Sequence, residues 1–119
     1  MFRIAILDDH DDTRSLLRLW LEDKYEVSDY AAPEPLIADL SARDFHLLLL
    51  DLRLPMTDGF EVVQAIRKIP SRPRPAIIAL TASAFNAEKE RAREVGFDDV
   101  LTKPIDLERL NGTIRKYLH

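Results

Sequence analysis

The sequence has no cysteine, so it offers no disulfide and no thiolate that could act as a nucleophile or a metal ligand. The apolar start breaks off at Asp8, too early for a signal peptide, and no stretch approaches the roughly 20 apolar residues of a membrane-spanning helix. The 17 lysines and arginines are outnumbered by 21 acidic residues, whereas a non-specific nucleic-acid binder needs a basic face. We therefore expect a cytoplasmic protein that binds neither membranes nor nucleic acid directly.

Glycine is scarce as well. Gly59, Gly96 and Gly112 form no glycine-rich loop, which excludes a nucleotide-binding Rossmann domain. The sequence shows no internal repeat and no low-complexity segment. Because 119 residues suffice to bury one hydrophobic core, we expect a single domain over residues 1–119.

The central feature of the sequence is a run of four leucines, Leu47–Leu50, that leads directly into Asp51. Pro55 ends the element four residues later. A short, unbroken apolar run bounded by turn residues is typical of a strand that is covered on both faces. A carboxylate at the end of such a strand lies where doubly wound sheets bind their ligands.

Strand and helix patterns alternate five times along the chain. Strands are predicted at residues 3–7, 25–30, 47–50, 76–80 and 99–102. Apolar residues at helical spacing follow each strand, and Asp11 or Asp12 is expected to cap the first helix and Asp106 the last. A stiff, proline-rich connector, Pro70–Pro75, precedes the fourth strand. The alternation predicts an α/β fold: a doubly wound, five-stranded parallel sheet with five helices on its two faces.

Polar side chains stand at the ends of the predicted strands. Asp8 and Asp9 follow the first strand, Asp51 the third, Thr81 the fourth and Lys103 the fifth. In a parallel sheet these ends share one edge, so the residues meet there if the first and third strands are neighbours. Three adjacent carboxylates stay ionised only beside cationic partners, and Mg²⁺ is the natural one because it prefers oxygen ligands.

The charges of this predicted cluster indicate phosphoryl transfer. Three carboxylates, one Mg²⁺ and Lys103 sum to zero, and a phosphoryl group would add about −1.5 to −2. Only the metal ion, Lys103 and nearby amides could offset that charge, and such neutralisation is most of the catalysis in phosphoryl transfer. Asp51 is then the candidate nucleophile, which would form an aspartyl phosphate.

The chain resembles, from end to end, the receiver domain of two-component response regulators. The matching motifs are Asp8-Asp9, Asp51, the Pro55–Gly59 turn, Thr81-Ala82 and Lys103-Pro104, each at the expected strand end and in the expected order. Each motif is common by itself, but the five together are highly specific. The resemblance implies a flavodoxin-like sheet with strand order 2-1-3-4-5.

The resemblance also implies a role for each residue of the cluster. Asp51 would accept a phosphoryl group from the phosphohistidine of a histidine kinase or a histidine phosphotransfer protein. Asp9 would bind Mg²⁺ directly and Asp8 through water, and the backbone carbonyl of Arg53 would be a further ligand. Lys103 would pair with Asp51 and then with the phosphoryl oxygens.

Thr81 is implied to turn its hydroxyl onto the phosphoryl group, and the Lys103-Pro104 bond looks like the family's cis peptide. One position departs from the family. Many receivers carry an aromatic residue three positions before the lysine, whose rotation reports phosphorylation, and here that position is Val100. Because valine has no ring to rotate, we expect the signal to travel through the fourth strand, the loop Ala82–Asn86 and the fourth helix.

Other polar residues have simpler interpretations. His10 is expected to be an exposed loop histidine rather than a ligand, because Mg²⁺ prefers oxygen. Asp58 is expected to be a turn residue before Gly59, not a further metal carboxylate, and Trp20 to lie in the core. In this family the surface of the fourth helix, fifth strand and fifth helix commonly meets a partner. The charged residues of the fourth helix are expected to form a solvated face: Glu88, Lys89, Glu90, Arg91, Arg93 and Glu94.

The sequence suggests three candidate functions. The first is a phosphorylation-switched receiver, a regulatory domain rather than an enzyme, which assists its own phosphorylation and dephosphorylation. The second is a constitutive docking module of the same fold, disfavoured by the complete charged cluster and supported only by Val100. The third, a phosphatase of the haloacid dehalogenase type, needs a second aspartate where Arg53 stands. The sequence is compatible with a downstream protein, a fused output domain or a homodimer, and does not distinguish them.

Overall fold

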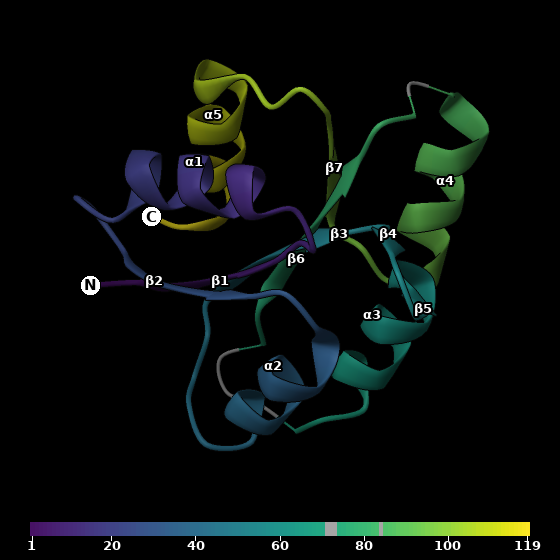
Figure 1. Cartoon of the computed structure of the whole chain (residues 1–119), viewed down its shortest axis with the longest axis horizontal. Coiled ribbons are helices and arrows are strands. Elements are labelled where there is room, and N and C mark those ends of the chain that lie inside the picture. Colours follow the sequence, from purple (N-terminus) through teal and green to yellow (C-terminus); the bar gives the residue numbers. More distant parts are fainter. Residues whose placement is uncertain (71–73, 84) are drawn as a thin grey trace.

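The computed structural model describes residues 1–70, 74–83 and 85–119, and a five-stranded parallel sheet forms its centre (Figure 1). Its strands, from one edge to the other, are β2 (Glu26–Tyr30), β1 (Arg3–Leu7), β3 (Leu47–Asp51), β6 (Ala76–Thr81) and β7 (Asp99–Thr102). Every neighbouring pair in this sheet is parallel. Counted in chain order, the strands stand as 2-1-3-4-5, which confirms the predicted flavodoxin-like, doubly wound fold.

Five helices cover the two faces of the sheet: α1 (Asp11–Leu21), α2 (Pro33–Leu40), α3 (Gly59–Arg67), α4 (Asn86–Val95) and α5 (Leu107–Tyr117). Figure 1 shows α1 and α5 together on one side and α2 and α3 on the other. The core is accordingly divided in two, because side chains of one strand alternate between faces. In β3, Leu47 and Leu49 pack toward α1 and α5, whereas Leu48 and Leu50 pack toward α2 and α3. This two-sided burial explains the unbroken leucine run.

The segment after Asp51 is more regular than the predicted turn. Residues Arg53–Leu54 (β4) and Thr57–Asp58 (β5) form a short antiparallel pair, so the turn itself is confined to the two residues between them. Asp58 then caps α3 by accepting a hydrogen bond from the backbone N–H of Phe60, at 2.7 Å. Asp58 is therefore not the turn residue that the sequence predicted, but the last residue of β5 and the N-cap of α3.

Gly59 is required by a close backbone approach. A Cβ atom at this position would lie 2.7 Å from the Cα of Leu52 and 2.8 Å from the carbonyl oxygen of Asp51. Both neighbours are backbone atoms and cannot rotate away, so only glycine allows α3 to begin this close to the end of β3. The glycine thereby helps to fix the backbone around Asp51.

Two helix ends test the capping predictions. Asp106 caps α5 as predicted, accepting from the N–H of Arg109 at 3.3 Å. The prediction for α1 was wrong: its N-cap residue is His10, without a side-chain cap, and Asp11 and Asp12 lie in the first turn. Carboxylates there still interact favourably with the helix dipole, so the acidic pair suits either position.

Trp20 packs, partly buried, against the core cluster under α1 and α5, as predicted. Its neighbours Leu16 and Leu19 are exposed on α1. Residues 71–73 of the proline-rich connector lie outside the described residues. Across the described ranges, no helix is both long enough and apolar enough to cross a membrane.

Candidate functional site

The carboxyl edge of the sheet brings together residues that are far apart in the sequence. Lys103, just after β7, donates from its Nζ atom to Asp8 Oδ2 at 2.8 Å and to Asp51 Oδ2 at 3.1 Å. The other oxygen of Asp51, Oδ1, accepts the backbone N–H of Arg53 at 3.0 Å. One lysine therefore bridges two carboxylates that the sequence had placed at the ends of neighbouring strands. The Lys103-Pro104 peptide bond is cis, as the resemblance implied.

Burial and charge act in opposite directions on these groups. Asp8 is fully buried and Asp51 is 3% exposed. The pKa of Asp51 is raised, chiefly by burial and also by the charge of Asp8. The hydrogen bond from the Arg53 N–H and the charge of Lys103 lower it, but they do not cancel the increase. Burial alone would also raise the pKa of Asp8, but hydrogen bonds from Lys103 and His10 outweigh this effect and hold the pKa below its usual value. Burial would lower the pKa of Lys103, yet its two carboxylate partners raise it, so the lysine stays charged.

A metal site is suggested by a carboxylate oxygen that lacks a hydrogen-bond partner. Asp9 Oδ1 is buried and accepts no hydrogen bond from any described residue. One ligand atom from each of Asp8, Asp9, His10 and Asp51 lies within 4.8 Å of the others. Three carboxylates in such a group, one of them with a buried oxygen that accepts no hydrogen bond from the described residues, fit a hard cation such as Mg²⁺, which takes oxygen ligands.

His10 lies closer to this cluster than the sequence suggested. Its side chain is 63% exposed, as expected, but its Nδ1 atom is 2.9 Å from Asp8 Oδ1 and 3.3 Å from Asp9 Oδ1. Its backbone N–H also donates to Asp8 Oδ1, at 2.9 Å. The spacing of two residues between Asp8 and His10 is typical of such an aspartate-centred turn, and this signal could have been used.

Thr81, the last residue of β6, is buried and makes two hydrogen bonds of its own. Its hydroxyl donates to Glu88 Oε1 at 3.0 Å and accepts the backbone N–H of Ser83 at 3.0 Å. Glu88 is only partly exposed, so its assignment to a solvated helix face was wrong. The sequence missed it because the helical pattern of α4 does not reveal which of its charged residues turns toward β6.

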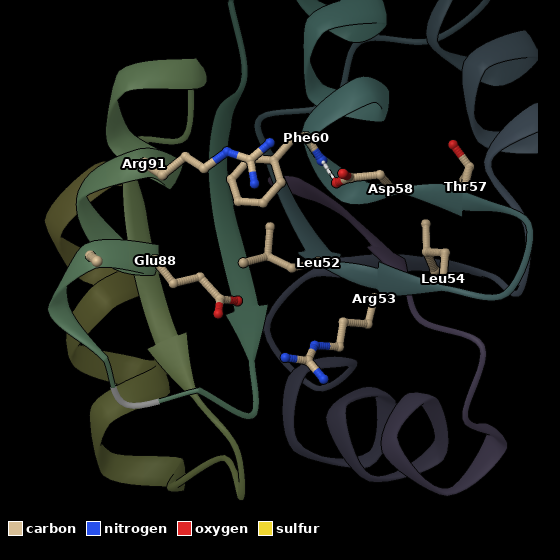
Figure 2. A pocket seen from close by; sticks show the side chains of 9 residues that line it. Leu52, Arg53, Leu54, Thr57, Asp58, Phe60, Glu88 and Arg91 are labelled. Atoms are coloured by element: carbon tan, nitrogen blue, oxygen red, sulfur yellow. Dashed lines mark hydrogen bonds between the residues drawn. The ribbon is translucent and has the colours of Figure 1, made fainter.

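A cavity of about 540 Å³ opens between the residues that follow Asp51 in the chain and the first turns of α4. Figure 2 shows its walls: Leu52, Arg53 and the β4–β5 pair on one side, and Glu88 and Arg91 of α4 on the other. The guanidinium of Arg91 lies over the ring of Phe60, 4.0 Å from its centroid. The Glu88 side chain points into this space, so the residue that binds Thr81 also lines the cavity.

Val100, at the position where an aromatic residue was expected from the family, lies in β7 and packs partly buried against the core under α3 and α4. The Tyr117 hydroxyl of α5 donates to the carbonyl of Asp98, which precedes β7, at 2.9 Å. His46 has a structural role: it precedes β3 and accepts the backbone N–H of Arg3 at 3.0 Å on its ring nitrogen.

A doubly wound sheet with buried aspartates and a lysine at its carboxyl edge defines the receiver-type class of flavodoxin-like domains. The family of response regulator receiver domains matches residues 4–115, and the chain belongs to it. The protein is thus a receiver domain of two-component signalling, as its sequence motifs indicated.

Three known proteins illustrate this relationship. The transcriptional regulatory protein ResD of Bacillus subtilis is 37% identical over 103 residues, which are 86% of this chain but only 42% of ResD. The chemotaxis protein CheY4 of Vibrio cholerae has a TM-score of 0.92 at 28% identity, with 99% of both chains covered. The receiver domain of Ssk1 from Saccharomyces cerevisiae, crystallised with the histidine phosphotransfer protein Ypd1, has a TM-score of 0.88 at 27% identity and covers 98% of this chain and 88% of that one.

Proposed function

We propose that this receiver domain is switched by phosphorylation of Asp51. The observation that carries the proposal is the bridging lysine: Lys103 binds both Asp8 and Asp51, while a buried oxygen of Asp9 accepts no hydrogen bond from the described residues. Three carboxylates face one ammonium group, so the cluster has a surplus of negative charge. A site of this kind favours a divalent cation and, with it, an incoming anion.

The phosphoryl group comes from a phosphohistidine. A carboxylate oxygen of Asp51 attacks phosphorus, the P–N bond breaks, and its electron pair stays on the imidazole nitrogen of the donor. The N–H of Arg53 holds one oxygen of Asp51 in place, and Lys103 moves from the carboxylates onto the phosphoryl oxygens. Such positioning and charge neutralisation carry most of the catalysis in phosphoryl transfer.

Mg²⁺ is the cofactor of this proposal. Asp9 and Asp51 would bind it directly, Asp8 through water, and the backbone carbonyl of Arg53 would complete the protein ligands. When bound, the ion neutralises the charge that develops on the phosphoryl oxygens. The buried oxygen of Asp9 supports this assignment, because it accepts no hydrogen bond from the described residues and such an oxygen is otherwise unfavourable.

The partner that donates the group is a histidine kinase or a histidine phosphotransfer protein, by similarity to the Ssk1 receiver crystallised with Ypd1. We propose a single cytoplasmic regulatory domain over residues 1–119, which assists its own phosphorylation and dephosphorylation. Its output passes to a downstream protein or a fused domain through a changed binding surface.

Beryllofluoride, a mimic of an aspartyl phosphate, tests this function. Amide NMR spectra are recorded with Mg²⁺ and increasing beryllofluoride for wild type, Asp51→Asn and the control Asp12→Asn, which changes an exposed aspartate of α1. We expect saturable shifts around Asp51 and Thr81 and in α4 for wild type and the control, and none for Asp51→Asn. Unchanged wild-type spectra would rule out the switch and leave the constitutive docking module.

A further inference from the structure

We propose that Glu88 is a positioning residue for Thr81, and that the hydrogen bond between them holds the unphosphorylated state of α4. This inference rests on the proposed function, because it concerns what phosphorylation of Asp51 must break. The bond joins the last residue of β6 to the first turn of α4, seven positions further along the chain. It therefore connects the edge of the sheet that carries the site to a helix on the outside of the molecule.

The argument begins with the single proton of the Thr81 hydroxyl. A hydroxyl donates one hydrogen bond and accepts through its lone pairs. Here the Ser83 N–H occupies a lone pair, and the proton is donated to Glu88 Oε1. A phosphoryl oxygen on Asp51 is only an acceptor, so it needs the same proton. Thr81 thus binds either Glu88 or the phosphoryl group, and the two bonds define two exclusive states.

The hydrogen bond from Thr81 to Glu88 is strong, and the phosphoryl group must compete with it. An ionised acceptor makes a hydrogen bond about twice as strong as a neutral one. Thr81 is 1% exposed, so water competes poorly for its hydroxyl. When the phosphoryl group takes the proton, Glu88 loses its donor while more negative charge arrives at the neighbouring strand end. Both changes favour movement of the Glu88 carboxylate away from β6.

The cavity that Glu88 lines leaves room for its carboxylate to turn away from Thr81. Figure 2 shows Glu88 pointing into this space, with the guanidinium groups of Arg53 and Arg91 on its walls. Arg91 lies three residues after Glu88 on the same helix, a spacing at which opposite charges interact. A released Glu88 therefore has cationic partners close by, and its movement changes the surface at the start of α4. This route does not need an aromatic side chain at Val100.

The test measures the apparent Kd of beryllofluoride in saturating Mg²⁺, together with the amide shifts of α4 before ligand is added. Wild type is compared with Glu88→Ala, Glu88→Gln and the control Glu90→Ala, which removes an exposed glutamate from the same helix. Losing a hydrogen bond that opposes binding should tighten beryllofluoride binding about five- to tenfold in Glu88→Ala. Glu88→Gln should fall between, because a neutral amide oxygen accepts a weaker bond, and Glu90→Ala should match wild type.

Repeating the Glu88→Ala substitution in a Thr81→Val protein separates the effect of the hydrogen bond from the effect of the Glu88 charge. In Thr81→Val the hydroxyl is gone, so adding Glu88→Ala should leave the Kd unchanged. If the gain persists in Thr81→Val, it arises from charge alone and the inference is overturned. Wild-type affinity and wild-type α4 shifts in Glu88→Ala would overturn it as well. If wild type itself fails to bind beryllofluoride, the proposed function falls and the inference with it, an outcome distinct from the other two.

Discussion

The ends of β3 and β6 lie side by side in the sheet, yet their polar residues are held in different ways. Asp51, which ends β3, is bound by Lys103 and by the N–H of Arg53. Thr81, which ends β6, is bound by Ser83 and Glu88 from the loop and helix that follow it. The Asp51 side chain thus has one local and one distant partner, whereas both of these Thr81 partners come from the segment that follows it.

The difference in sequence separation has a physical consequence. Lys103 lies 52 positions from Asp51 and 95 from Asp8, so those contacts form only when the whole sheet is assembled. The partners of Thr81 lie two and seven positions away. Local contacts can rearrange when one loop moves, whereas the backbone positions that bring Lys103 to Asp8 and Asp51 can change only if the packing of the core changes. The contacts of Lys103 with Asp8 and Asp51 are therefore expected to be rigid, whereas the contacts of Thr81 can rearrange.

The largest loss of stability is expected from removing Lys103, which makes the long-range contacts. Lys103→Ala leaves Asp8 and Asp51 buried without their cation, and we expect a loss of about 2–4 kcal/mol in the free energy of unfolding in Mg²⁺-free buffer. Urea denaturation measures this change. The control is Lys116→Ala, because Lys116 pairs with Asp99 at the surface and should contribute less than about 1 kcal/mol.

Magnesium sharpens the same prediction. If the carboxylates bind Mg²⁺, the ion should restore part of the stability of Lys103→Ala and stabilise this variant more than wild type, since it neutralises the charges that the lysine left unpaired. A Lys103→Ala protein as stable as wild type without Mg²⁺ would contradict the assigned role of the lysine.

A somewhat smaller effect is expected at the backbone around Asp51. Gly59→Ala forces a Cβ against the backbone of Leu52 and Asp51, and we expect a loss of about 1–3 kcal/mol together with weaker beryllofluoride binding. Gly112→Ala is the matched control. This glycine lies exposed inside α5 with no atom near its missing Cβ, so alanine should stabilise the protein by about 0.5–1 kcal/mol. Equal effects at the two glycines would refute the close-approach argument.

Removal of the local contacts should be milder. Thr81→Val keeps the shape of the side chain but loses two hydrogen bonds, for which we expect a loss of about 1–2 kcal/mol. Amide hydrogen exchange should quicken in α4 and remain unchanged in α1, because the hydrogen bond joins β6 to α4 alone. Uniformly faster exchange in both helices would show that Thr81 acts on the whole fold.

The smallest effect on stability is expected from the ionisation of two tyrosines, one at each edge of the sheet. Burial and an acidic neighbour raise the pKa of Tyr30 on β2, and likewise of Tyr117 beside β7, from 10.0 to about 12. Since the folded state favours the protonated phenol, these groups contribute stability below pH 10 that is lost as the pH rises toward 12. Spectrophotometric titration should show two phenols ionising late, with one late step missing in each of Tyr30→Phe and Tyr117→Phe. Ionisation of both near pH 10 would contradict the prediction.

The sequence by itself determined the fold and the composition of the site. The unbroken leucines before Asp51 required a strand buried on both faces, and alternation with helices required parallel crossovers, which place all strand ends on one edge. Periodicity and element order therefore placed Asp8, Asp9, Asp51, Thr81 and Lys103 on one edge of the sheet. The resemblance to receiver domains added the strand order that makes the first and third strands neighbours. These properties depend on residue patterns along the chain, which is why sequence reasoning reached them.

Only the tertiary structure decided which partner each side chain takes. The turn of His10 onto Asp8, the choice of Glu88 rather than Glu90 to bind Thr81, and the exposure of Leu16 depend on how each helix is rotated against the sheet. Helical periodicity defines a face to within a few residues, but hydrogen bonding selects a single side chain by distances of a few tenths of an ångström. That selection arises from packing between elements, and the sequence of one element does not contain it.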